Sequence, residues 1–219
     1  MRVLCLATQK GGTGKSTLAV SLAVAAEEGG EKAVVVDLDP QGTSSHWYET
    51  RSAESPPVID HNEAGTLDNT LAKLREAGFT LAVIDTPGSD SHATRAAMRA
   101  ADLCLVPVRP SEADVKATEP TTKALLALGR PFALIINQAP PNRQARLTSA
   151  VALRLSTSGV VVPGALAARV DHQYAYALGL GVTEFAPKSK AAAEVAELWA
   201  WCRKKLEGKP HVQQTQRRA

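Results

Sequence analysis

The octapeptide KGGTGKST at residues 10–17 constrains the fold of this chain more than any other feature. It follows an apolar, strand-like run at residues 3–8 and opens a helix-like run that extends to about Glu28. Three glycines in so short a connection let the backbone curl until its N–H groups converge, and the start of the helix adds the positive end of its dipole. Such a turn binds anionic oxygens, above all those of phosphate groups. The sequence therefore predicts a strand–loop–helix unit that holds a phosphate group.

The side chains of this segment, which we call the P-loop, have distinct expected roles. Lys15 is placed to bridge the β- and γ-phosphates of a nucleotide, the Ser16 hydroxyl can ligate Mg²⁺, and Thr17 can reach the next phosphate inward. The ordinary pattern, GxxxxGK[ST], needs glycine at position 9, where this chain has Gln9. A second lysine, Lys10, stands just before the first glycine instead. Taken alone, Lys10 could also be an ordinary surface lysine.

Apolar strand-like runs alternate with helix-like segments along the chain. The expected strands are residues 3–8, 33–37, 81–85, 103–108, 132–137 and 160–162. The expected helices are about 15–28, 67–77, 92–101, 113–128, 143–156, 172–178 and 190–206, with 41–65 irregular. The strands are nearly continuous runs of Val, Ile, Leu and Ala, which indicates burial on both faces of a parallel sheet. We expect an α/β fold of the P-loop NTPase type: a doubly wound, mostly parallel sheet with helices on both faces and ligands at the carboxyl ends of its strands.

Bulk properties limit the class of protein. The 219 residues suit one domain, which we place at residues 1–207, and no apolar run approaches the roughly 20 residues of a membrane-spanning helix. The strand begins at once after Met1-Arg2, so we expect no signal peptide and a cytoplasmic location. Three widely spaced cysteines indicate core thiols, not a disulfide framework or a metal cluster. Residues 203–219 hold six basic residues and one acid; the tail at 208–219 could attract a polyanion or simply be frayed.

Carboxylates follow two of the apolar strands. AVVVDLDPQG at residues 33–42 contains Asp37 and Asp39, and the two-residue spacing puts both on one side of an extended chain end. LAVIDTPG at residues 81–88 places Asp85 at the end of another strand, in a Walker B pattern whose carboxylate holds the hydration shell of magnesium. An aspartate pair at a strand end could merely cap the following turn. Beside a P-loop, a magnesium site is the favoured interpretation.

The octapeptide resembles the deviant Walker A box of the ParA/MinD superfamily of ATPases, and DLDPQG resembles the second box of that superfamily. The segments LVPVRPSEADVKATEPTTKAL and GVTEFAPKSKAAAEVAEL are similar to small ParA-type partition ATPases that lack an N-terminal helix-turn-helix. The resemblance covers nearly the whole chain. At residues 86–88 the chain has Thr-Pro-Gly where the family often has a second proline.

The resemblance implies ATP and Mg²⁺ as cofactors and assigns roles to individual residues. Lys10 would reach across an ATP-dependent homodimer to the partner's ATP, and Lys15 and Asp39 would serve hydrolysis, with Asp39 orienting the attacking water. Asp37 would lie near Mg²⁺ through water, together with Ser16 and Asp85. The implied ATP contacts are Lys10, Gly11, Gly12, Thr13, Gly14, Lys15, Ser16, Thr17, Asn137 and Pro163. Asn137 could instead be a local turn cap.

The resemblance also implies a function. Members of this branch are slow, partner-stimulated ATPases that bind DNA nonspecifically as ATP dimers, and a ParB-like or other cargo-bound adaptor releases them. The expected location is therefore the nucleoid, and the work is plasmid or chromosome segregation or the positioning of another cargo. The candidate DNA contacts are Arg143, Arg146, Arg169, Lys188 and Lys190. For each of these, a solvated surface charge is the alternative.

Two other classes of function compete with this one. A MinD-like ATPase would bind a membrane through an amphipathic C-terminal helix, and residues 191–206 carry apolar side chains at helical spacing. We expect that helix to pack on the sheet instead. A metabolic ligase resembling dethiobiotin synthetase would need a pocket for a small acceptor; the Lys10-Gly11-Gly12 start and the DLDPQG box argue against it.

Overall fold

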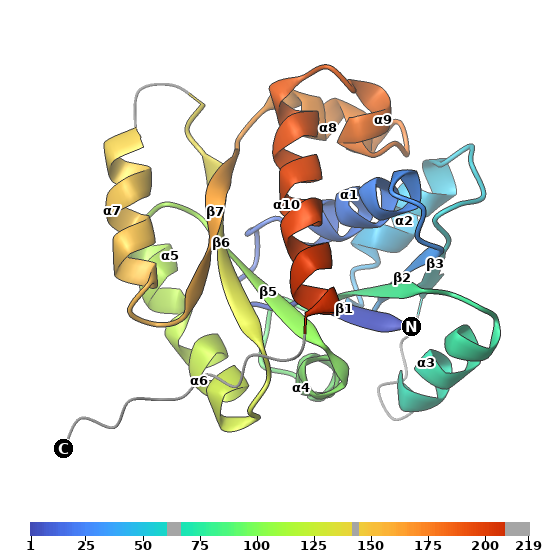
Figure 1. The fold of residues 1–219 in the computed structure, drawn as a ribbon, viewed down its shortest axis with the longest axis horizontal. Coiled ribbons are helices and arrows are strands. Elements are labelled where there is room, and N and C mark those ends of the chain that lie inside the picture. The colour runs from blue at the N-terminus through green and yellow to red at the C-terminus, as the bar shows by residue number, and fades with distance from the viewer. Residues whose placement is uncertain (61–66, 142–144, 209–219) are drawn as a thin grey trace.

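The computed structural model describes residues 1–60, 67–141 and 145–208. Within them, seven parallel strands form one sheet in the order β3-β2-β4-β1-β5-β6-β7 (Figure 1). The strands are β1 (Arg2–Leu6), β2 (Ala33–Asp37), β3 (Val58–Asp60), β4 (Leu81–Asp85), β5 (Leu103–Val108), β6 (Phe132–Ala139) and β7 (Val160–Ala167). The helices are α1 (Lys15–Glu28), α2 (Thr43–Thr50), α3 (Leu67–Glu76), α4 (His92–Ala100), α5 (Glu112–Ala117), α6 (Glu119–Ala127), α7 (Ala145–Leu155), α8 (Val170–Ala177), α9 (Val182–Phe185) and α10 (Lys190–Glu207).

Alternate residues of the buried strands point to opposite faces and create two apolar layers. Val3 and Cys5 of β1 belong to the layer under α3, α4, α6 and α7, whereas Leu4 and Leu6 belong to the layer under α1 and α10. Burial on both faces is what the continuous apolar runs predict. The doubly wound α/β fold is therefore confirmed, and the single domain at residues 1–207 stays a prediction.

The strand order brings the predicted site together. β1 lies between β4 and β5, and β4 in turn pairs with β2. The strands that follow β1 in the chain are therefore added on both sides of it in the sheet. The parallel register pairs Leu6 with Asp85 and Asp85 with Asp37. The P-loop after β1 and the carboxylates that end β2 and β4 consequently share one edge of the sheet, where ligands bind in such folds.

Several expected elements differ in the structure. Residues 41–65 are not wholly irregular, because α2 and β3 lie within them, and the helix expected at 113–128 is divided into α5 and α6 at Thr118. The short α9 was not predicted. β7 continues to Ala167, so Pro163 lies within the strand and not beyond the end expected at residue 162. A proline is tolerated there because β7 is the last strand in the order and pairs on one side only.

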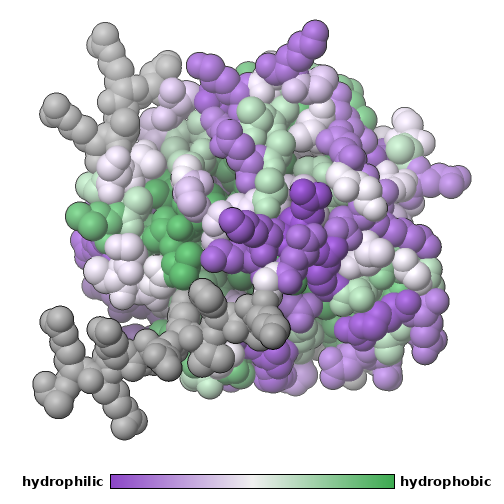
Figure 2. All heavy atoms as spheres, in the orientation of Figure 1, coloured by the Kyte–Doolittle hydropathy of each residue, from purple (hydrophilic) through white to green (hydrophobic). Residues whose placement is uncertain are grey.

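The last helix packs as a core helix. Val195, Leu198, Trp199 and Cys202 are all buried in the layer shared with α1. In Figure 2, pale green runs along the upper half of the outward face of α10 and purple covers its lower part, whereas stronger green gathers over β7 and α7. Among the described residues, no helix is both long and apolar enough to cross a membrane. The predicted tail lies outside the described residues apart from Gly208.

Candidate functional site

A cavity of about 680 Å³ opens between the P-loop and the carboxyl ends of β2 and β4; we call it the loop cavity. Its wall includes Gly11, Gly12, Gly14, Lys15, Ser16, Thr17, Asp39, Thr43 and Gly88. Gly14 begins α1 with φ +87°, and a Cβ there would lie 2.5 Å from the Asn137 amide nitrogen. Any other residue would be strained at that backbone angle and would collide, so the tight turn requires glycine here.

Two amide side chains from β6 support the P-loop from behind. Asn137 donates from Nδ2 to the Thr13 carbonyl at 2.7 Å, and Gln138 donates from Nε2 to the Gly12 carbonyl at 3.1 Å. These bonds hold the loop carbonyls away from the cavity, which leaves the loop N–H groups for a phosphate. Asn137 thus supports the P-loop through a hydrogen bond, a role that the sequence did not indicate.

Lys15 lies at the bottom of the loop cavity with an exposed fraction of 6%. Burial lowers its pKa, while the charges of Asp85 and Asp39 oppose that shift. A buried ammonium among carboxylates, at the start of a helix, is suited to holding phosphate oxygens.

Asp85 and Asp37 form a buried carboxylate pair beside Lys15. Asp85 is fully buried; its Oδ2 accepts from the Ser44 hydroxyl at 2.8 Å, and its Oδ1 has no hydrogen-bond partner among the described residues. Asp37 accepts from the backbone N–H of Ser45 at 2.9 Å and from its hydroxyl at 3.0 Å. Burial, and after it the charge of Asp37, raises the pKa of Asp85 to about 7.

This pair fits a magnesium ion. A buried carboxylate oxygen without a partner is costly, and a cation would satisfy it. The described residues contain no cluster of three His, Cys, Asp or Glu side chains. Mg²⁺ needs none, because it keeps several waters and takes one or two carboxylates together with substrate phosphates. Asp85 and the neighbouring Ser16 hydroxyl would hold the ion, with Asp37 behind its waters; the ion would supply charge neutralisation on the phosphates.

Lys10 is placed differently from Lys15. It is absent from the wall of the loop cavity, and its Nζ lies 2.7 Å from Asp114 Oδ1 in α5. Arg109 contacts the same oxygen at 3.1 Å. Burial would raise the pKa of Asp114, but the hydrogen bonds from Lys10, Ser111 and Arg109 hold it below its usual value. The carboxylate is therefore ionised and holds the Lys10 side chain outside the loop cavity.

A second cavity, of about 460 Å³, lies on the other side of the P-loop; we call it the α8 cavity. Gly14, Thr17 and Leu18 form one wall, and Asn137 and Gln138 form another. The third wall comes from Arg169, Val170, His172, Gln173 and Tyr176. Its position beside Thr17 suits the nucleoside end of a nucleotide. The α8 residues carry no sequence motif, so only the tertiary structure identifies them.

Comparison with known proteins decides the family. Residues 4–180 match the family model described as the CobQ/CobB/MinD/ParA nucleotide binding domain. The chain belongs to the ParA/MinD family. It is 31% identical to "Maintenance of carboxysome distribution protein A" of Gloeobacter kilaueensis, over 88% of this chain and 89% of that protein.

Solved structures of ParA/MinD proteins share the fold. The septum site-determining protein MinD of Pyrococcus horikoshii OT3, complexed with Mg-ADP, has a TM-score of 0.74 at 18% identity and covers 93% of this chain and 96% of its own. A Cyanothece McdA–ATP complex has a TM-score of 0.68 at 18% identity and covers 97% and 99%. The predicted membership and the predicted P-loop ATPase are confirmed, and the nucleotides in these structures agree with ATP and Mg²⁺ as cofactors.

The remaining predicted site residues of this ParA/MinD ATPase separate into groups. Pro163 lines neither the loop cavity nor the α8 cavity but a third one, between β7 and α7. Arg169 lines the α8 cavity and pairs with Glu194 at 2.6 Å, so it is not a free cation for DNA. Lys188 and Lys190 are exposed at the start of α10. Arg143 lies outside the described residues, and the side chain of Arg146, in α7, is not among those described.

The raised pKa of Asp85 makes a prediction for the metal-free protein. An acid whose folded-state pKa exceeds its unfolded value stabilises the fold below the unfolded pKa and loses that contribution as pH rises to the folded pKa. From pH 5 to pH 7 this group should lower the free energy of unfolding by about 2 kcal/mol, and above pH 7 by less than about 0.5 kcal/mol more. Asp85→Asn, which cannot ionise, should lack this decrease. Urea unfolding of both proteins from pH 5 to pH 8 measures the difference; parallel pH profiles would refute the assignment.

Proposed function

We propose that this protein is an ATP-driven positioning ATPase. Two ATP-loaded copies pair, the pair binds DNA without regard to sequence, and a cargo-bound adaptor with a ParB-like role stimulates hydrolysis and so releases it. The nucleoid in the cytoplasm is then the proposed location. The observation that carries this proposal is the position of Lys10: a P-loop lysine that does not face its own nucleotide cavity.

The contrast between the two P-loop lysines is the first step. Lys15 already supplies a buried cation to the loop cavity, whereas Lys10 is 30% exposed and pairs with Asp114. A cation on this loop can act on phosphate charge in a second copy when two loop cavities face each other. A ligase with a small acceptor would gain nothing from a lysine so placed.

The Asp114 contact supports a lysine that can be released. The Lys10 side chain is 30% exposed, so water can solvate its ammonium when it leaves Asp114, whose own side chain is only 6% exposed. Arg109 and the Ser111 hydroxyl also contact Asp114, so the carboxylate keeps partners when Lys10 leaves. The cost of moving Lys10 to a second subunit's nucleotide is accordingly small.

DNA is the proposed surface on which the pair is held. The exposed Lys188 and Lys190 and the basic chain end after α10 supply positive charge in the C-terminal part. Contacts of this kind reach phosphates and not bases, so they weaken steeply with salt. The membrane alternative has less support, because the apolar side chains of α10 that suggested it are buried against the sheet.

A large protein assembly is the proposed cargo. The Gloeobacter relative named for carboxysome distribution aligns over 88% of this chain, which makes a carboxysome-like compartment the first candidate. Plasmid or chromosome DNA is the second candidate. The adaptor in either case is the molecule that links this ATPase to its cargo.

The proposal is tested by ATP-dependent dimerisation and DNA binding of the wild type and of Lys10→Ala. Light scattering should show a dimer of the wild type with ATP and Mg²⁺ and a monomer with ADP. The dimer should retard random-sequence DNA in a gel, and its affinity should fall by orders of magnitude between about 50 and 200 mM salt. Lys10→Ala should bind ATP but neither dimerise nor retard DNA.

Lys123→Ala is a suitable control, because Lys123 is an exposed lysine in α6 whose contact to Glu119 is long, at 3.9 Å. It should behave as the wild type. A normal ATP-induced dimer of Lys10→Ala would show that Lys10 is not needed at the nucleotide of the second copy. Binding of the ATP form to anionic vesicles but not to DNA would favour the membrane alternative.

A further inference from the structure

Tyr176 lies between the two cavities that flank the P-loop. Its side chain forms part of the wall of the α8 cavity, while its hydroxyl donates to the backbone carbonyl of Thr43. Thr43 is the first residue of α2 and lines the loop cavity. Among the hydrogen bonds of the described residues, the one from Tyr176 joins α8 to the first turn of α2.

The residues that follow Thr43 hold the metal carboxylates. The Ser44 hydroxyl donates to Asp85 Oδ2 at 2.8 Å and is fully buried. Ser45 donates twice to Asp37 Oδ2, from its backbone N–H and from its hydroxyl. The first turn of α2 thus fixes which oxygens of Asp85 and Asp37 remain for a metal ion, in particular the unpartnered Oδ1 of Asp85.

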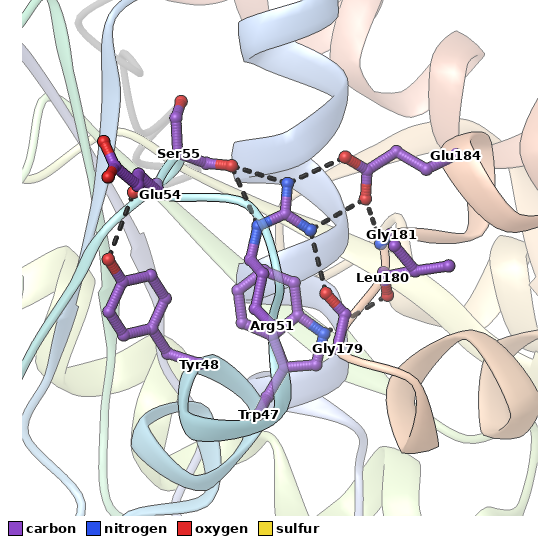
Figure 3. A network of polar contacts seen from close by, with 9 residues as sticks. All are labelled: Trp47, Tyr48, Arg51, Glu54, Ser55, Gly179, Leu180, Gly181 and Glu184. Carbon is purple, nitrogen blue, oxygen red and sulfur yellow. Dashed lines mark hydrogen bonds and ion pairs between the residues drawn. The ribbon is translucent and has the colours of Figure 1, made fainter.

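The C-terminal end of α2 is bound to α9 and to the segment between α8 and α9 (Figure 3). Arg51 pairs with Glu184 of α9 through two hydrogen bonds of 2.9 and 2.7 Å and donates to the Gly179 carbonyl at 2.8 Å. Trp47 donates from Nε1 to the Leu180 carbonyl at 3.2 Å. With α2 held at this end, the hydrogen bond from Tyr176 is a further contact on its first turn, beside those that Ser44 and Ser45 make to the carboxylates.

The phenol is suited to donate this bond. Burial raises the pKa of Tyr176 to about 12, and the charges of Asp85 and Asp37 act in the same direction. The hydroxyl therefore keeps its proton at neutral pH and can donate it to the Thr43 carbonyl.

We propose that Tyr176 is a positioning residue for hydrolysis: by holding the Thr43 carbonyl it sets the first turn of α2, and through Ser44 and Ser45 it orients Asp85 and Asp37 toward the metal ion. It touches neither the metal nor the γ-phosphate. The proposal rests on the ATPase activity of the family and does not depend on the cargo, the adaptor or DNA.

The test is steady-state ATP hydrolysis by Tyr176→Phe without DNA or adaptor. The substitution keeps the ring in the α8 cavity and removes only the hydroxyl. We expect kcat to fall about three- to tenfold, the effect of losing one hydrogen bond, with KM for ATP unchanged. Tyr174→Phe is the matched control, because Tyr174 is on the same helix but 60% exposed; it should hydrolyse ATP as the wild type does.

A double-mutant cycle with Ser44→Ala separates positioning from a general loss of structure. If Tyr176 acts through the first turn of α2, the double variant should be no slower than the slower single variant, because both break the same path. Effects on kcat that multiply would overturn the proposal. As a readout other than turnover, the Mg²⁺ affinity of the ADP-bound protein, measured by calorimetry, should weaken in Tyr176→Phe and not in Tyr174→Phe. An unchanged Mg²⁺ affinity or an unchanged kcat in Tyr176→Phe, or a raised KM with unchanged kcat, would overturn the proposal as well.

Discussion

Asp39→Ala is expected to retain ATP affinity and to lose hydrolysis by a factor on the order of 10²–10⁴, the range for a positioned acid–base group. Asp39 lines the loop cavity, and its Oδ1 accepts the backbone N–H of Gln41 at 3.0 Å, which fixes the carboxylate against the cavity wall. A carboxylate there can accept a hydrogen bond from water and aim it in line with the leaving oxygen. We expect the phosphates themselves to be held by the loop N–H groups and Lys15.

Asp85→Ala provides the contrast to this variant. It removes the unpartnered oxygen that fits the metal ion, so nucleotide binding should weaken together with hydrolysis. Single-turnover hydrolysis and nucleotide affinity, measured for both variants, distinguish the two roles. Under the proposed function, the ATP dimer of Asp39→Ala should accumulate and stay on DNA. Wild-type turnover in Asp39→Ala, or loss of ATP binding there, would show that Asp39 does not position the water.

Glu184→Gln is expected to lower the free energy of unfolding by about 1–3 kcal/mol, between the values for exposed and for fully buried ion pairs, because the Glu184 side chain is 27% exposed. The Arg51 side chain is only 2% exposed, and the Glu184 carboxylate is its charged partner in Figure 3. The substitution removes the negative charge beside the buried guanidinium, which keeps the carbonyls of Ser55 and Gly179, the Trp47 ring 5.0 Å away and at most one amide oxygen of the new side chain. Urea unfolding measures this loss, and an unchanged m-value would show that the variant changes stability and not the surface exposed on unfolding.

Arg51→Met is the matched variant for the same pair. It removes the buried charge, and the carboxylate left behind is 27% exposed and still accepts the Gly181 N–H at 2.8 Å. Arg51→Met should therefore lower the free energy of unfolding clearly less than Glu184→Gln does. Equal costs for the two variants would mean that packing, and not the unpaired charge, determines the loss.

The backbone around this pair also limits substitution. Gly179 has φ +66°, and a Cβ there would lie 2.5 Å from the backbone nitrogen of Arg51. The end of α8 therefore approaches α2 backbone to backbone, which brings the Gly179 carbonyl within reach of the guanidinium. Glu184, Gly179 and Arg51 form one unit that no local pattern in the sequence indicates.

The parts of the site that local sequence determines were predicted from it. The glycines of the P-loop, the position of Lys15 at the start of α1, and the aspartates at the ends of β2 and β4 all follow from patterns of ten residues or fewer. Strand periodicity and turn chemistry act between neighbours in the chain, so they can be seen without the fold. Residues 41–65 were misjudged because α2 is short and largely polar and β3 has only three residues.

Contacts between distant segments were decided by the tertiary structure alone. Asp114 as the partner of Lys10, the amide of Asn137 under the Thr13 carbonyl, and the Tyr176 hydroxyl on Thr43 join residues that lie far apart in the chain. The sequence by itself determined that this chain is a ParA/MinD-type P-loop ATPase, because the P-loop and its carboxylates are local motifs. Only the sheet order β3-β2-β4-β1-β5-β6-β7 and the packing of α8 on α2 decided which side chains meet around the nucleotide, since those pairings depend on how the crossovers place distant segments.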